Sequence, residues 1–385
     1  MSERLNAADL IALIRRVFRP TAADERLGIL VDLPDGRTAD RPEWKERRRM
    51  AADWAGQLQQ HRDQLGLDVS LVLYRNVGMG NADLPARVWI GSPGSVPDTA
   101  DALDPARAVS LDQVLATHSV LLAPTEFSAT APLKLMAKQH RFRAATMPGF
   151  TAEMIPALRL DYDEVRRRVA IMKGLLDRAV RATLHFEVDG RDTRTLVLDL
   201  RHRQAHASDG IIETPGMAGN LPSGEAYIVP YEGEVPGDPT QSAGRLPVQF
   251  GADVVVFEIE ANRAVRVTGE GQAAVEQAEW LVAEPAYGNL AELGLGVLGD
   301  LGVGPTGEIL MDEKLGLHIA FGRSDHFGGQ VGAARFSKPE AVVHIDRIYL
   351  PGLQPRVVPR VVDLLDEDGR TIPLMRDGVY AKGVL

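Results

Sequence analysis

The segment Leu27–Leu33, LGILVDL, decides the fold class of the first part of the chain. It is a short apolar run of the kind that forms a buried β-strand. A long predicted helix, Pro42–His61, follows it and has a proline in its first turn. Two more apolar runs, Val69–Tyr74 (VSLVLY) and Ser119–Ala123 (SVLLA), come later, and Ala7–Phe18 before them has helical spacing. Strands that alternate with helices predict an α/β layer with a mainly parallel sheet.

No phosphate-binding loop follows any of these strands. The only glycine pair near a strand end, in Gly78-Met79-Gly80, lacks the GxGxxG or Walker pattern that a nucleotide site needs. We therefore expect the first part of the chain to be a scaffold or a substrate-facing domain.

The pattern changes near residue 150. A helix is predicted over Tyr162–Arg178, and another short one over Ala274–Val282. Gly, Pro and Asp turns separate a series of strand-like segments, which are Thr183–Val188, Thr195–Leu200, Ala226–Val229, Asp253–Ile259 and Ala264–Val267. We expect an α/β plus β-rich protein, with an N-terminal α/β layered domain at residues 1–150 and a C-terminal β-rich domain at residues 151–385.

Composition excludes several classes of function. The 385 residues carry 43 Lys and Arg against 53 Asp and Glu, a net charge of −10, so an acidic surface would repel a phosphate backbone. Cysteine is absent, which excludes disulfides and thiolate ligands and suits a reducing compartment. No window approaches the roughly 18 apolar residues of a membrane span. We expect a cytoplasmic protein without nucleic-acid or membrane partners.

Two histidines lie in apolar, strand-like segments of the second half. They are His318, in LHIA, and His344, in VHID. Side chains two residues apart on a strand point to the same face, so His344 and Asp346 are presented together. A core histidine satisfied by a neighbouring aspartate is the alternative explanation.

Three glutamates in weakly polar surroundings favour a metal site. Glu225, Glu292 and Glu313 would be costly to bury unless they are paired or bind a cation. Together with two imidazoles and an aspartate they make an oxygen-rich donor set, which suits Zn, Co, Mn or Fe(II). Six ligands exceed the three or four of one catalytic zinc ion and would suffice for two ions bridged by a carboxylate.

Four motifs resemble those of the aminopeptidase T family of metallo-aminopeptidases. They occur in the family's order and cover roughly residues 215–350. The motifs are Leu221–Glu225 (LPSGE), Asn289–Gly294 (NLAELG), Met311–Ser324 (MDEKLGLHIAFGRS) and His344–Asp346 (HID).

This resemblance implies a co-catalytic pair of divalent ions, Zn, Co or Mn, in the C-terminal domain. It implies that Glu292 or Glu313 bridges the ions, and that metal-bound water attacks the carbonyl of a small amino-terminal peptide or amide. It also implies a small-molecule or short-peptide substrate and a homodimer. The ligands implied by the resemblance are Glu225, Glu292, Glu313, His318, His344 and Asp346.

The sequence departs from the family at one position. The family has a catalytic tyrosine seven residues after the first histidine, where this chain has Asp325, followed by His326. An ionised aspartate cannot donate a hydrogen bond to an oxyanion, whereas His326 can. His326 is therefore a candidate for the role of the missing tyrosine. We take Glu292, His326 and Asp325 as the candidate catalytic residues.

Two alternatives to the hydrolase follow from this departure. The mononuclear Fe(II) 2,5-dihydroxypyridine 5,6-dioxygenases belong to the same superfamily, and residues 147–168 resemble that branch as well. This alternative implies one Fe(II) and a ring-opening reaction on an N-heteroaromatic substrate. The other alternative is a metal-binding relative that has lost catalysis.

Overall fold

The computed structural model describes residues 3–385 and confirms an α/β plus β-rich architecture. The chain forms two compact units, each described here by itself. The first unit comprises the chain up to Arg166 together with Asp209–Ser223, and the second comprises Arg167–Ser208 and Gly224–Leu385.

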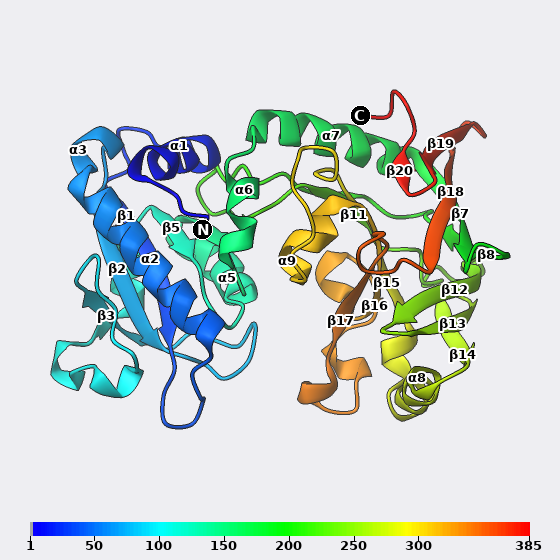
Figure 1. Ribbon diagram of the computed structural model, residues 1–385, viewed down its shortest axis with the longest axis horizontal. Coiled ribbons are helices and arrows are strands. Elements are labelled where there is room, and N and C mark those ends of the chain that lie inside the picture. Colours follow the sequence, from blue (N-terminus) through cyan, green and yellow to red (C-terminus); the bar gives the residue numbers. More distant parts are fainter. Residues whose placement is uncertain (1–2) are drawn as a thin grey trace. The chain divides into compact units, whose positions relative to one another are not determined.

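The first unit is built on a seven-stranded sheet of order β10-β6-β5-β1-β2-β3-β4. Figure 1 labels β1, β2, β3 and β5 of this sheet. The strands from β10 to β2 pair in parallel, and β3 and β4 are antiparallel, so the predicted mainly parallel sheet is confirmed. Its strands are β1 (Arg26–Leu33), β2 (Asp68–Arg75), β3 (Arg87–Gly91), β4 (Val109–Ser110), β5 (Val120–Ala123), β6 (Arg143–Thr146) and β10 (Ala218–Asn220). The α-helices that begin before Arg166 are α1 (Ala7–Phe18), α2 (Pro42–Gln60), α3 (Arg62–Leu65), α4 (Leu111–Thr117), α5 (Thr130–His140), α6 (Ile155–Leu158) and α7 (Tyr162–Arg178). The last of them, α7, continues into the second unit.

Helices cover the central strands of this sheet. β1 is buried from Leu27 to Leu33, as expected of a strand with helices on both faces. Helices α1 and α2 contact each other, and α2 contacts β1 and β2. Helices α4 and α5 share a core with Leu30, Val72 and Leu121.

Asp32 lies near the carboxyl end of β1, at the point where the strand order reverses between β1 and β5. Its buried carboxylate accepts hydrogen bonds from the backbone N–H groups of Glu126 (2.8 Å) and Phe127 (3.0 Å) and from Nε1 of Trp44 (3.1 Å). The acidic side chain thus fixes the loop after β5 to the end of β1.

The second unit holds two antiparallel sheets. One has five strands in the order β17-β16-β15-β11-β9, and the other has eight in the order β14-β13-β12-β8-β7-β18-β19-β20. The five-stranded sheet contains β9 (His206–Ser208), β11 (Glu225–Ile228), β15 (Leu290–Gly296), β16 (Leu317–Gly322) and β17 (His344–Ile348). The larger sheet contains β7 (Ala179–Val188), β8 (Asp192–Asp199), β12 (Ala243–Phe250), β13 (Asp253–Glu260), β14 (Arg263–Gly269), β18 (Val357–Asp366), β19 (Thr371–Arg376) and β20 (Val379–Tyr380). This unit also contains most of α7, from Arg167 on, together with α8 (Gln272–Ala283) and α9 (Ile309–Asp312).

An aromatic contact joins the two sheets of the second unit. The rings of Phe257 on β13 and Phe321 on β16 lie 4.8 Å apart. Because side chains alternate along a strand, the face of β16 opposite to Phe321 carries His318 and Ala320. That opposite face of the five-stranded sheet holds the candidate site.

Across residues 3–385, no helix combines the length and apolarity needed to span a bilayer.

Candidate metal centre

The five-stranded sheet lines up five of the six predicted ligands. Glu292 on β15 is opposite Ala320 on β16, and Ala320 is opposite Asp346 on β17. These positions, and those two residues away along each strand, share one face of the sheet. That face also carries Glu225 from β11, His318 from β16 and His344 from β17, while Glu313 lies in the short 3-10 helix Glu313–Leu315 before β16.

Local backbone features aim two of these side chains. Gly294 is opposite His318, and a Cβ at Gly294 would lie 1.9 Å from Nε2 of His318. The imidazole therefore lies over β15 in space that only glycine leaves open. On the same strand, a β-bulge between Leu290 and Glu292 shifts the register just before the glutamate, and such bulges commonly redirect a side chain.

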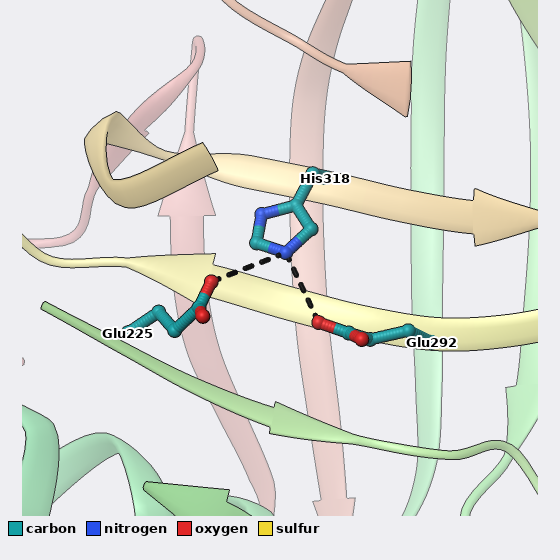
Figure 2. Close-up of side chains that lie close together, drawn as sticks. All are labelled: Glu225, Glu292 and His318. Carbon is teal, nitrogen blue, oxygen red and sulfur yellow. Dashed lines mark hydrogen bonds and ion pairs between the residues drawn. The ribbon is translucent and has the colours of Figure 1, made fainter. Parts of the chain in front are cut away.

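Glu292 lies between the two histidines. Its Oε1 is 3.2 Å from Nε2 of His318, and its Oε2 is 3.3 Å from Nε2 of His344. On the other side of His318, Oε2 of Glu225 lies 3.5 Å from the same Nε2 (Figure 2). Glu225, Glu292 and His318 thus form one buried group of three donors.

A second group of donors consists of Glu292, His344 and Asp346. Nε2 of His344 is 3.6 Å from Oδ1 of Asp346. Nδ1 of His344 lies 2.8 Å from the carbonyl oxygen of Arg323, which can only accept, so Nδ1 carries the proton. Nε2 is then the nitrogen left for a cation, as is usual for metal-binding histidines.

A buried lysine, which the sequence analysis missed, pairs with two of the glutamates, Glu225 and Glu313. The ammonium of Lys314 is fully buried, lies 2.5 Å from Oε1 of Glu225, and also pairs with Glu313. Its position directly after Asp312 and Glu313, and before the apolar strand β16, was the only signal in the sequence. Lys314 holds both carboxylates in place and balances part of their charge.

The crowding of acidic groups shifts the pKa values of the cluster. Burial alone lowers the pKa of His318, but Glu292 and Glu225 raise it to about 9. Burial likewise opposes the charged form of His344, yet its acidic neighbours raise its pKa well above the ordinary value. Burial and neighbouring carboxylates raise the pKa of Glu313 to about 8. The acidic neighbours therefore hold protons on both imidazoles, and a cation bound at Nε2 would take the place of those protons.

The residues present fit a divalent cation. Oε2 of Glu225 is buried and has no hydrogen-bond partner among residues 3–385, and only Nε2 of His318, 3.5 Å away, compensates it, although a buried carboxylate oxygen without a hydrogen bond is costly. The two groups of three donors supply carboxylate oxygen and imidazole nitrogen, which borderline and hard divalent ions accept. Glu313 lies in the cluster through Lys314 but belongs to neither group.

An aromatic group borders the cluster. Tyr227 stands on β11, its ring stacks on His206 at 5.2 Å, and it meets Phe327 edge-on at 4.7 Å. Burial and the charges of Glu292 and Glu225 raise the pKa of the Tyr227 phenol, so the ring lies close to those carboxylates. The spacing Glu225-x-Tyr227 within a strand was the sequence signal for this neighbour.

The two remaining candidate residues lie at the edge of the site. The ring of His326 is 5.2 Å from that of His344, and burial together with His344 lowers the pKa of His326 to about 4, so its imidazole is neutral. Asp325 is exposed and pairs with Nε of Arg323 at 2.5 Å. The structure gives His326 a contact with a predicted ligand, whereas Asp325 pairs with Arg323.

Solved enzymes with a similar fold are found over nearly the whole chain. The 2,5-dihydroxypyridine dioxygenase from Pseudomonas putida KT2440 has a TM-score of 0.59 and 16% sequence identity, and the match covers 98% of each chain. The aminopeptidase AmpT from Thermus thermophilus, in its wild-type form, has a TM-score of 0.51 and 17% identity, and covers 97% of this chain and 99% of its own. No protein-family model matches the sequence, and no curated protein does. The expected resemblance to these two kinds of enzyme is confirmed for the fold.

Proposed function

We propose that this chain is a metal-dependent hydrolase that cleaves the amide bond next to a free amino group in a small substrate or short peptide. The observation that carries the proposal is the position of Glu292, whose two carboxylate oxygens face two different histidines. A carboxylate shared by two donor groups suits two cations a few ångströms apart. The similarity of the fold to that of AmpT supports the same reaction class.

Each part of the cluster has a role in this proposal. When bound, divalent cations would lower the pKa of a water molecule and polarise the substrate carbonyl. Glu225, Glu292 and His318 would hold one cation, and Glu292, His344 and Asp346 the other. His326, as a neutral imidazole beside His344, is a candidate hydrogen-bond donor to the substrate. Asp325 would act indirectly, through Arg323.

Metal analysis and turnover test the proposal together. We expect about two divalent ions per chain in protein purified without chelators, and amine release from aminoacyl-anilides without oxygen consumption. In His344→Ala the metal content should fall, because one donor group loses its imidazole. His185→Ala is the matched control, because His185 bonds Thr195 in the larger sheet. Full metal content in His344→Ala would contradict the proposed centre.

A ring-opening dioxygenase is the second candidate function. It is favoured by the higher TM-score of the dihydroxypyridine dioxygenase and by the absence of a tyrosine at position 325. This function requires a single ferrous ion, and oxygen consumption with a dihydroxypyridine. A chain that binds metal and performs neither reaction would be a relative without catalysis.

A further inference from the structure

We propose that Tyr227 is a catalytic residue of this centre, whose hydroxyl donates a hydrogen bond to the substrate oxygen that gains negative charge during the reaction. The inference rests on the proposed hydrolase and deepens it. It assigns a role to a residue that lies beside the donor cluster and ligates nothing in it.

The strand register brings Tyr227 to the centre of the site face. Tyr227 is opposite Gly294 on β15, and Gly294 is in turn opposite His318 on β16. Because Gly294 has no side chain, the imidazole of His318 and the ring of Tyr227 border the same space above β15. Glu225 precedes Tyr227 by two residues and shares its face, and Glu292 is a diagonal neighbour on β15.

The ring of Tyr227 is fixed by contacts that do not involve its hydroxyl. His206 stacks on one side, with an angle of 21° between the ring planes, and Phe327 packs against it edge-on. Nε2 of His206 donates to the carbonyl oxygen of Phe327 at 2.9 Å, so the two neighbours hold each other. The phenol is therefore oriented before any substrate binds, and this lowers the cost of using it in a transition state.

The hydroxyl itself is free to bind a ligand. Within residues 3–385 no hydrogen bond of this hydroxyl is found, and the side chain keeps partial exposure. The ammonium of Lys314, a neighbouring hydrogen-bond donor, is already paired with Glu225 and Glu313. A phenol is neutral at neutral pH and donates through one O–H group, so it can stabilise a developing oxyanion.

The substitution Tyr227→Phe removes only the hydroxyl. We expect metal content and thermal midpoint to stay at the wild-type values, because the ring contacts remain. The kcat for amine release should fall by about 10²–10³-fold, the effect of removing one oxyanion donor, with KM changed much less. Affinity for a 1-aminoalkylphosphonate, a tetrahedral anion, should fall by at least about tenfold in titration calorimetry of the metal-loaded protein. Affinity for the corresponding free amino acid should change less.

Tyr349→Phe is the matched control. It also loses one hydroxyl in the second unit, but that hydroxyl donates to the carbonyl oxygen of Pro247 in the core. Wild-type kcat and phosphonate affinity in Tyr227→Phe, beside an active wild-type enzyme, would overturn the role of Tyr227 and leave the proposed hydrolase standing. A metal-loaded wild-type protein that neither releases amine nor binds the phosphonate would overturn both.

Discussion

Gly294 determines where the imidazole of His318 can lie. We expect Gly294→Ala to lower the affinity for the metal by about 10–100-fold, as is typical when a feature that orients a ligand is lost. The physical reason is the 1.9 Å approach of the new Cβ to Nε2, which forces the ring away from Glu225 and Glu292. Metal content after dialysis against a weak chelator measures the effect.

A second glycine provides the control for this substitution. Gly304 has open space around its Cβ position, so Gly304→Ala should keep the metal content of the wild type. Equal metal content in the two variants would contradict the placement of His318 over β15.

Metal binding should release protons, and its affinity should rise with pH. Because the acidic neighbours raise the pKa of His318 to about 9, this imidazole is protonated at pH 7 when no cation is bound. A cation needs the neutral ring, so it must displace the proton, and that cost falls as the pH rises and disappears only above pH 9. Titration calorimetry in buffers of different ionisation enthalpy counts the protons released. A count of zero at pH 7 would contradict this expectation.

At the scale of the elements, Asp32 connects β1 to the loop after β5. Both of its oxygens accept backbone N–H groups, so the amide nitrogen of Asp32→Asn would face a donor. We expect a loss of about 1–3 kcal/mol in the free energy of unfolding. Burial raises the pKa of Asp32 to about 7, so urea unfolding should be measured at pH 8, where the carboxylate is charged.

The exposed Asp63 serves as the control for this element. Its side chain is fully exposed, so Asp63→Asn should leave the stability nearly unchanged. If Asp32→Asn is as stable as Asp63→Asn, the carboxylate does not hold the loop.

Elements with strong local patterns were predictable from the sequence. The helix Tyr162–Arg178 has the predicted bounds, and the side chain of Asp161 accepts the N–H of Asp163 at its start. The polar residues His318, His344 and Asp346 stood out because apolar strands surround them. Their alignment with Glu292 depends on the bulge and on pairing between strands far apart in sequence, which no local pattern encodes.

Lys314 and Tyr227 show what single-sequence reasoning misses at the site. A lysine or a tyrosine between apolar residues is compatible with a surface position or with a core. Only the assembled sheet brings Lys314 against Glu225, 89 residues away in the sequence, and brings the ring of Tyr227 against Phe327.

At the scale of the whole molecule, cation binding should stabilise the second unit. A ligand at 100 times its Kd contributes about 2.7 kcal/mol to the folded state. We expect a chelator to lower the thermal midpoint of the transition that includes the five-stranded sheet, and added divalent metal to restore it. Differential scanning calorimetry measures both, and a midpoint independent of metal would contradict a cation centre in this unit.

The two oxygens of Glu292 have a thermodynamic consequence. Because one carboxylate belongs to both donor groups, the two halves of the proposed two-ion centre would not be independent binding sites. The first ion to arrive would orient the side chain for the second and would also repel it, so titration curves would depart from those of identical, separate sites. A single substitution at Glu292 would then affect both steps of loading at once.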